Sequence, residues 1–147
     1  MTNVSHSPLL PIAFFVLVWV VVGFLLGKVS GWAALGRDYA FPNPFDGKSW
    51  RFQCAQMRWM SNYNNCLTVG ANEQGLYLSI FFVLRIGHPS LFIPWRDISV
   101  TRKKIWWARI LELGLGQETP VPFRIREKLA NRLKKAAGKS WPAEMEA

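Results

Sequence analysis

The clearest feature of the hydrophobic pattern is an apolar run close to the N-terminus. Residues 9–27, LLPIAFFVLVWVVVGFLLG, contain no Asp, Glu, Lys or Arg. At about 1.5 Å per residue, a helix of this length nearly spans a hydrocarbon core of about 30 Å. Pro8 and Pro11 fall in its first turn, where a missing N–H group costs little. Because only a helix satisfies the backbone of a single segment in lipid, the pattern predicts a transmembrane anchor over residues 1–27.

The next segment combines a short amphipathic stretch with prolines. Residues 28–49, KVSGWAALGRDYAFPNPFDGKS, end in the turn-rich sequence PNPFDG, which excludes a long helix. Trp32 and Tyr39 follow the apolar run closely, in a position where aromatic side chains favour the membrane interface. We therefore expect residues 28–49 to form an interfacial linker.

Residues 50–139 carry the pattern of a small domain that begins with strands. Residues 50–60 predict a first strand, and the sequence SNYNN at 61–65 predicts a polar turn. The alternation that follows predicts two further strands separated by a turn at 73–75. Its inward positions are Leu67, Val69 and Ala71 on the first of these strands, and Leu76, Leu78, Ile80 and Phe82 on the second.

The second half of this domain predicts more strands and then a helix. Pro94 in the short run LFIPW indicates an edge strand or a bulge, because proline cannot donate a ladder hydrogen bond. Strand-like residues continue to Gly116. From Phe123 the apolar positions recur at helical spacing, which predicts an amphipathic helix of about four turns. These positions are Ile125, Leu129, Leu133 and Ala136 or Ala137, and residues 140–147 are expected to be a tail.

The charges change the picture because all of them lie after residue 27. The chain has 18 Lys and Arg against 9 Asp and Glu, a net charge of +9. Lys28 and Arg37 follow the apolar run and no basic residue precedes it, so the positive-inside rule predicts an outer N-terminus and a cytoplasmic domain. A cleaved secretory signal is the alternative, but the first eight residues lack Lys and Arg. We therefore expect the protein to lie in a membrane with its domain on the cytoplasmic side.

Candidate chemistry is sparse. Cys54 and Cys66 lack CxxC spacing and nearby histidines, so neither a disulfide framework nor a metal site is expected. His88 with Ser90 and Asp97 can be drawn as a catalytic set, but any chain of this size offers one, and we expect His88 to be a plain turn histidine. No carboxylate pair and no phosphate-binding loop is present either. We expect a protein without catalytic residues, metal ligands or cofactors.

Two basic clusters remain as candidate lipid-binding or partner-binding sites. One places three cations before two indoles, a combination suited to headgroup phosphates and the interface, although either indole could instead be core. Its members are Arg102, Lys103, Lys104, Trp106 and Trp107. The other is a basic face of the terminal helix, with Lys128, Arg132 and Lys135, for which a solvated surface is the plain alternative. Nucleic acid is disfavoured, because no recognition motif accompanies the charge.

Several short motifs resemble those of a known group of proteins. The sequences GLYLS at 75–79, HPSLFIPW at 88–95 and IPW-x-D-I at 93–98 resemble segments of uncharacterised bacterial single-pass membrane proteins with a PH-like or GRAM-like domain. The resemblance covers at most residues 66–136. It implies an α+β fold, in which a transmembrane helix precedes a small, antiparallel, partly open β-barrel closed by a C-terminal amphipathic helix.

Together these observations predict a non-catalytic interaction module. The transmembrane helix would hold a basic PH-like domain at the cytoplasmic face for a protein partner or for anionic lipid headgroups. An accessory subunit of a larger membrane complex is the alternative, because Gly23 and Gly27 would allow another helix to approach closely.

Overall fold

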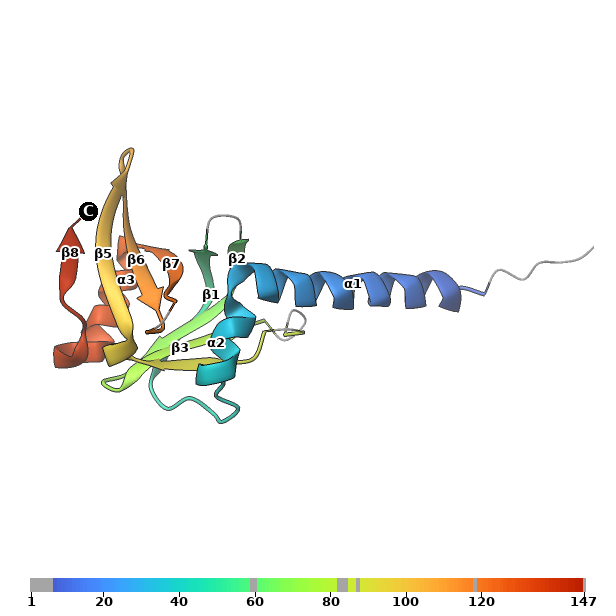
Figure 1. The fold of residues 1–147 in the computed structure, drawn as a ribbon, viewed down its shortest axis with the longest axis horizontal. Helices are drawn as coiled ribbons and strands as arrows, with labels where there is room; N and C mark the ends of the chain where they lie inside the picture. The colour runs from blue at the N-terminus through green and yellow to red at the C-terminus, as the bar shows by residue number, and fades with distance from the viewer. Residues whose placement is uncertain (1–6, 59–60, 82–84, 87, 118, 147) are drawn as a thin grey trace, which may run out of the picture.

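The computed structural model describes residues 7–58, 61–81, 85–86, 88–117 and 119–146. A long helix, α1 (Leu9–Ser30), projects from a domain built on one curled sheet (Figure 1). Pro8 stands at the N-cap, as the position of the prolines predicts. Gly31 ends the helix with a φ of 86°, in the left-handed region that glycine adopts without strain. The short helix α2 (Trp32–Tyr39) follows at once.

The sheet has eight strands in the order β4-β3-β2-β1-β7-β6-β5-β8 and forms a half-barrel. Neighbouring strands are antiparallel except β5 and β8, which pair in parallel. The strands are β1 (Lys48–Met57), β2 (Ser61–Ala71), β3 (Gly75–Ile80), β4 (Leu91–Pro94), β5 (Ile98–Ile105), β6 (Ala108–Leu115), β7 (Val121–Arg126) and β8 (Glu144–Glu146). Short 3-10 turns cover Trp95–Asp97 and Gly138–Ser140. Helix α3 (Glu127–Ala137) packs against β2, β6 and β7.

The predicted inward positions form the core. Leu67, Val69 and Ala71 on β2 are buried, as are Leu76, Leu78 and Ile80 on β3, whereas Phe82 lies outside the described residues. Leu129 and Leu133 of α3 close the core. Pro94 ends β4, which lies at one edge of the sheet, as proline requires. The predicted α+β class and the apolar N-terminal helix are therefore confirmed.

Residues 61–65 do not form the predicted turn but open strand β2. Tyr63 is buried, whereas Asn62 and Asn64 on either side are exposed. Strand alternation therefore holds in this segment, and its three asparagines obscured the one aromatic residue that belongs to the core.

The predicted four-turn helix is also wrong at its beginning. Residues Val121–Arg126 are strand β7, and α3 starts at Glu127 and has 11 residues. Val121, Phe123 and Ile125 are buried with period two, and Ile125 also lies four residues before Leu129. The two periods share Ile125, so the helical spacing masked the end of the strand.

The expected tail and linker both pack onto the domain. Within residues 140–147, β8 pairs with β5, and Trp141 packs against Trp95 with ring centroids 5.3 Å apart. Within residues 28–49, the exposed surface of Trp32 is 0%, so this indole is core and not an interfacial anchor. Its Nε1 donates to the carbonyl of Pro89 at 2.6 Å.

A buried polar cluster joins α1 to the sheet at this point, and we call it the junction. It consists of Ser30 at the end of α1, Tyr63 on β2 and His88 before β4, each at most 2% exposed. Tyr63 Oη lies 2.9 Å from both Ser30 Oγ and His88 Nε2. His88 Nδ1 donates to the carbonyl of Ile86 at 3.0 Å. Because buried polar groups require such partners, the junction fixes the helix against the domain.

Two further contacts hold the helix in this position. Arg58 donates to the carbonyl of Val29 at 3.2 Å, where a cation also suits the C-terminus of a helix. A Cβ added to Gly23 would lie 3.1 Å from the carbonyl oxygen of Ile86, so the helix packs closely here. Gly23 lies about 6 Å along the helix from the end of the apolar run, so Ile86 packs beside the apolar part of α1.

We expect the junction to make stability fall in mild acid. Burial lowers the pKa of His88 below its ordinary 6.5, despite the opposing hydrogen bond to Ile86. The unfolded chain then binds a proton that the folded chain resists, so stability is complete above pH 6.5 and declines as the pH falls through that value. Thermal unfolding of the full chain in detergent between pH 7.5 and 5.5 measures this decline.

The control for this prediction is His88→Gln, which cannot titrate. We expect this substitution to lower the free energy of unfolding by about 1–3 kcal/mol at pH 7.5, because the junction is weakened. We also expect it to flatten the dependence of stability on pH between 7.5 and 5.5. An unchanged slope in the variant would contradict the assignment to His88.

Candidate functional site

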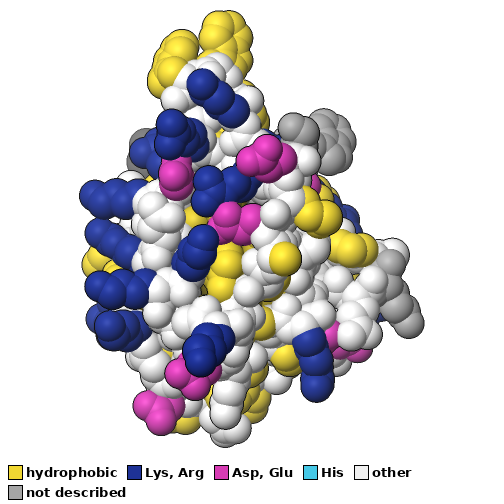
Figure 2. Space-filling model, turned by 90° about the vertical axis from the view of Figure 1, so that its left-hand side faces the viewer, with side chains coloured by type: hydrophobic (Ala, Val, Ile, Leu, Met, Phe, Trp, Pro, Cys, Tyr) yellow, Lys and Arg dark blue, Asp and Glu magenta, His cyan; other side chains and the backbone are white. Residues whose placement is uncertain are grey.

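The tip of the β5–β6 hairpin presents two tryptophans to solvent. Ile105 pairs with Ala108, so Trp106 and Trp107 fill a two-residue turn. They are 80% and 85% exposed, and their rings lie edge to face at 5.9 Å. Hydrophobic side chains accordingly project from this end of the domain, with Lys and Arg below them (Figure 2). Both indoles are thus at the surface, which settles the question that the sequence left open.

The backbone at this tip is strained. Trp106 has a φ of 59°, which glycine prefers at the first position of such a turn. A bulky side chain in this region costs about 1–2 kcal/mol. The hairpin therefore carries two large apolar side chains in a turn that a smaller residue would form more easily, a combination that is typical of binding sites.

Most of the cations predicted for this site are already paired. Arg102 donates to Glu144 on β8, and Lys103 donates to Glu112 at 2.8 Å. Arg124 on β7 donates to Glu112 as well, at 3.0 Å. Partial burial raises the pKa of Glu112, but these two hydrogen bonds outweigh it and leave the pKa below its ordinary value. The hydrogen bond from Arg102 likewise lowers the pKa of Glu144. The tip is consequently more apolar and less cationic than its sequence suggests.

The basic face of α3 forms a separate surface. Lys128, Arg132 and Lys135 are exposed along this helix. Their neighbour Lys134 is paired with Glu144 at 3.3 Å. Figure 2 shows a column of Lys and Arg side chains down one edge of the domain. The structure therefore keeps the two predicted basic clusters on different elements. Glu144 bridges Arg102 and Lys134, and Arg109 on β6 pairs with Glu127 on α3 at 3.8 Å.

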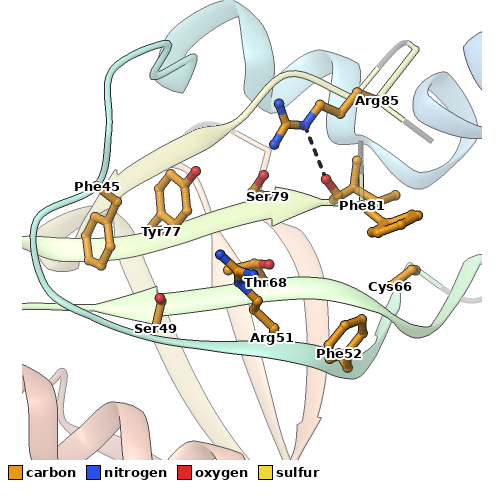
Figure 3. Close-up of a pocket in the computed structure, with 11 residues that line it drawn as sticks. Phe45, Ser49, Arg51, Phe52, Cys66, Thr68, Tyr77, Ser79, Phe81 and Arg85 are labelled. Atoms are coloured by element: carbon orange, nitrogen blue, oxygen red, sulfur yellow. Dashed lines mark hydrogen bonds between the residues drawn. The ribbon is translucent and has the colours of Figure 1, made fainter. Parts of the chain in front are cut away.

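A third surface, which sequence reasoning missed, lies on the outer face of β1, β2 and β3. It is a trough of about 420 Å³ that contains two arginines, Arg51 and Arg85 (Figure 3). All three strands contribute hydroxyl groups to its lining. Its further lining residues are Phe45, Ser49, Phe52, Cys66, Thr68, Tyr77, Ser79, Ile80 and Phe81. No carboxylate is among the described residues that line it.

A bulge in β1 creates one wall of the trough. Trp50 pairs with Val69 and Gln53 with Leu67, so Arg51 and Phe52 together face the single residue Thr68. Phe52 has a φ of 56° and is 65% exposed. Core packing does not explain an exposed aromatic ring held in a strained bulge, and bulges of this kind re-aim side chains at functional sites.

Phe45 closes the other end of the trough. Its ring stacks on Tyr77 at 4.7 Å with an angle of 9° between the planes. Gly70 makes this possible, because a Cβ there would lie 2.7 Å from the Phe45 ring. The proximity of Arg51 and Arg85 could have been predicted from the sequence only by placing the bulge in β1 and the path of the chain after β3.

The trough continues toward the anchor. An apolar crevice of about 270 Å³ separates α1 from the sheet, lined by Trp19 and Leu26 on the helix and by Ile86 beyond β3. The crevice shares Cys66 and Ile80 with the trough. The end of the trough at Cys66 and Ile80 therefore adjoins the crevice along α1.

The catalytic set that can be drawn from the sequence is not assembled. His88 is engaged in the junction, Ser90 donates to Ser79 at 3.3 Å, and Asp97 accepts from Tyr39 at 3.0 Å. Among the described residues, no group of three or more His, Cys, Asp or Glu side chains could hold a metal ion.

Comparisons of the chain with protein-family models, with curated proteins and with solved structures found no match. The surfaces of this chain itself therefore carry the argument.

The strain at the hairpin tip predicts an unusual response to mutation. Trp106→Gly relieves the positive φ, so we expect the melting temperature of the full chain to rise by up to about 5 °C although a large side chain is lost.

The matched control is Trp107→Gly. Trp107 is not among the described residues with positive φ. Glycine at position 107 only increases the conformational entropy of the unfolded chain. We therefore expect the free energy of unfolding to fall by about 0.5–1 kcal/mol. Equal effects of the two substitutions would contradict the strain at position 106.

Proposed function

We propose that the protein is a membrane-anchored, non-catalytic interaction module. In this proposal α1 crosses a bacterial inner membrane, the N-terminus lies outside, and the domain faces the cytoplasm with its hairpin tip available to a protein partner. The observation that carries the proposal is the pair of exposed tryptophans, with a strained backbone at Trp106, at the end of a hairpin in which Arg102 and Lys103 are ion-paired.

The anchor is supported by length, composition and exposure. Helix α1 is 22 residues long, is apolar enough to cross a membrane, and has none of its most apolar 18-residue window buried in the protein. Leaving this surface in water would be costly at about 25 cal/mol per Å² of apolar area. Lys28 and Arg58 lie at the C-terminal end of α1. These cations support the proposed orientation through the positive-inside rule.

A protein is the better partner for the tip than the membrane that holds α1. The β5–β6 hairpin runs across the direction of α1, on the side of the domain away from it (Figure 1). With α1 upright in a bilayer, the tip then points along the membrane and not into it. Tryptophan is enriched among the residues that dominate protein interfaces, and paired cations add little attraction to anionic lipid.

The resemblance of the sequence motifs to PH-like domains agrees with this function. A curled sheet with a C-terminal helix against it is the architecture that the resemblance implies. The fold hosts several kinds of binding, so the partner must be inferred from the surface and not from the fold.

An accessory subunit within a larger complex is less well supported. Gly23 already packs closely against Ile86 of the same chain, so its small size serves a contact within the protein. Close packing of another helix at this position would have to displace the protein's own loop.

The anchor and its orientation predict the outcome of a topology experiment. A fluorescent reporter that matures only in the cytoplasm, fused after Ala147, should be bright and should sediment with membranes after alkaline extraction. An exported enzyme fused at the same point should be inactive. The reverse pattern, or a protein lacking its first 27 residues, would contradict the proposal.

The hairpin predicts a specific crosslink. A photo-crosslinking residue at position 107 should form adducts of discrete mass with one protein in native membranes, whereas the same residue at position 128 on α3 should not. The double variant Trp106→Gly/Trp107→Ser should lose the partner while remaining in the membrane. Lipid adducts at position 107 would show instead that the tip enters a bilayer.

A further inference from the structure

We propose that the trough between Arg51 and Arg85 binds the phosphate of an anionic phospholipid, whose acyl chains lie against the base of α1. The proposal rests on the membrane anchoring proposed above but concerns a different surface from the hairpin.

The charge of the trough selects an anion. Figure 3 shows the guanidinium groups of Arg51 and Arg85 on the same side of the strands, over Thr68 and Ser79. Arg85 Nε donates a weak hydrogen bond to the carbonyl of Ile80 at 3.4 Å, and among the described residues no partner accepts from its two terminal NH₂ groups. Planar guanidinium groups donate pairs of hydrogen bonds to phosphate oxygens.

The hydroxyl groups suit the remainder of a headgroup. Thr68 pairs with Ser79 across β2 and β3, and Ser49 lies on the neighbouring strand β1. These side chains can donate to phosphate oxygens or exchange hydrogen bonds with a glycerol hydroxyl. A volume of about 420 Å³ lies within the range of small-ligand sites.

The position of the trough beside α1 and the apolar side chains at one of its ends favour a lipid over a soluble anion. The trough shares Cys66 and Ile80 with the apolar crevice along α1. Phe52 and Phe81 are exposed beside the arginines, at the end of the trough where Cys66 lies (Figure 3). An inorganic phosphate would leave the Phe52 ring in water, whereas the chains of a lipid would cover it.

The bulge supplies an independent reason. It turns Arg51 and Phe52 toward the trough together. The backbone of Phe52 is strained as a result, because its φ lies in the left-handed region. An amphiphile is the ligand that uses both side chains at once, because its phosphate meets the cation and its chain meets the ring.

The test uses the full chain in neutral detergent micelles. Micelles doped with phosphatidylglycerol or phosphatidylcholine are titrated, and native mass spectrometry counts the lipids retained. We expect one phosphatidylglycerol per protein, with about tenfold preference over phosphatidylcholine. Arg51→Gln/Arg85→Gln should weaken binding by about 10- to 30-fold, since each cation near an anionic lipid contributes a factor of about five.

The matched control removes the same charge elsewhere. Arg132→Gln/Lys135→Gln on α3 should change the affinity less than about twofold. Ser49→Glu places a carboxylate at an exposed strand position in the trough and should abolish binding without loss of the fold, which circular dichroism verifies.

Three outcomes would overturn the proposal: equal affinity for the two lipids, an affinity within twofold after loss of both arginines, or inorganic phosphate at millimolar concentration displacing the lipid. Because the titration is independent of which way α1 crosses the membrane, its failure leaves the anchor standing. A failed topology experiment in turn leaves the measured affinity of the trough intact.

Discussion

The structure depends on the buried hydrogen bonds at the base of α1. An apolar helix attached to a domain by a flexible linker would say nothing about which face of the domain meets the membrane. Here Ser30, Tyr63 and His88 join three segments that are far apart in sequence, and Trp32 caps them from α2. Burial raises the pKa of Tyr63 to about 12, so its phenol keeps the proton that one of these bonds needs. The helix and the sheet consequently have one relative position.

That position separates the two surfaces that we assign to partners. The trough lies next to α1 and shares two of its lining residues with the crevice along the helix. The hairpin tip lies on the far side of the sheet (Figure 1). A lipid at the trough would hold the domain against the bilayer, while the tryptophans stay accessible to a protein. Both surfaces contain an aromatic residue with positive φ, Phe52 in one and Trp106 in the other.

Much of the fold could be predicted from local pattern. The anchor, the alternation of Leu76, Leu78 and Ile80, and the edge proline Pro94 all follow from short-range rules. The errors arose where two periods overlap at Ile125 and where one buried tyrosine stands among asparagines. The hairpin cluster was contiguous in sequence and so was visible. The ion pairs were not, because Arg102 pairs with Glu144 on β8 and Lys103 pairs with Glu112 across the hairpin, a register that the sequence pattern did not define. The trough was invisible because Arg51 and Arg85 meet only through the bulge and the sheet order.

The burial of Trp32 has a consequence for how this domain can be handled. This indole lies outside the stretch that reads as the domain, yet it fills the core and bonds to Pro89 near β4. A fragment trimmed to begin at the first strand would lack one wall of its own interior. Tyr63 would lose its hydrogen-bond partner Ser30, and the rings of Tyr63 and His88 would lose Trp32, which contacts both. Helix α2 and the end of α1 therefore belong to the same folding unit as the sheet, whose core is incomplete without them.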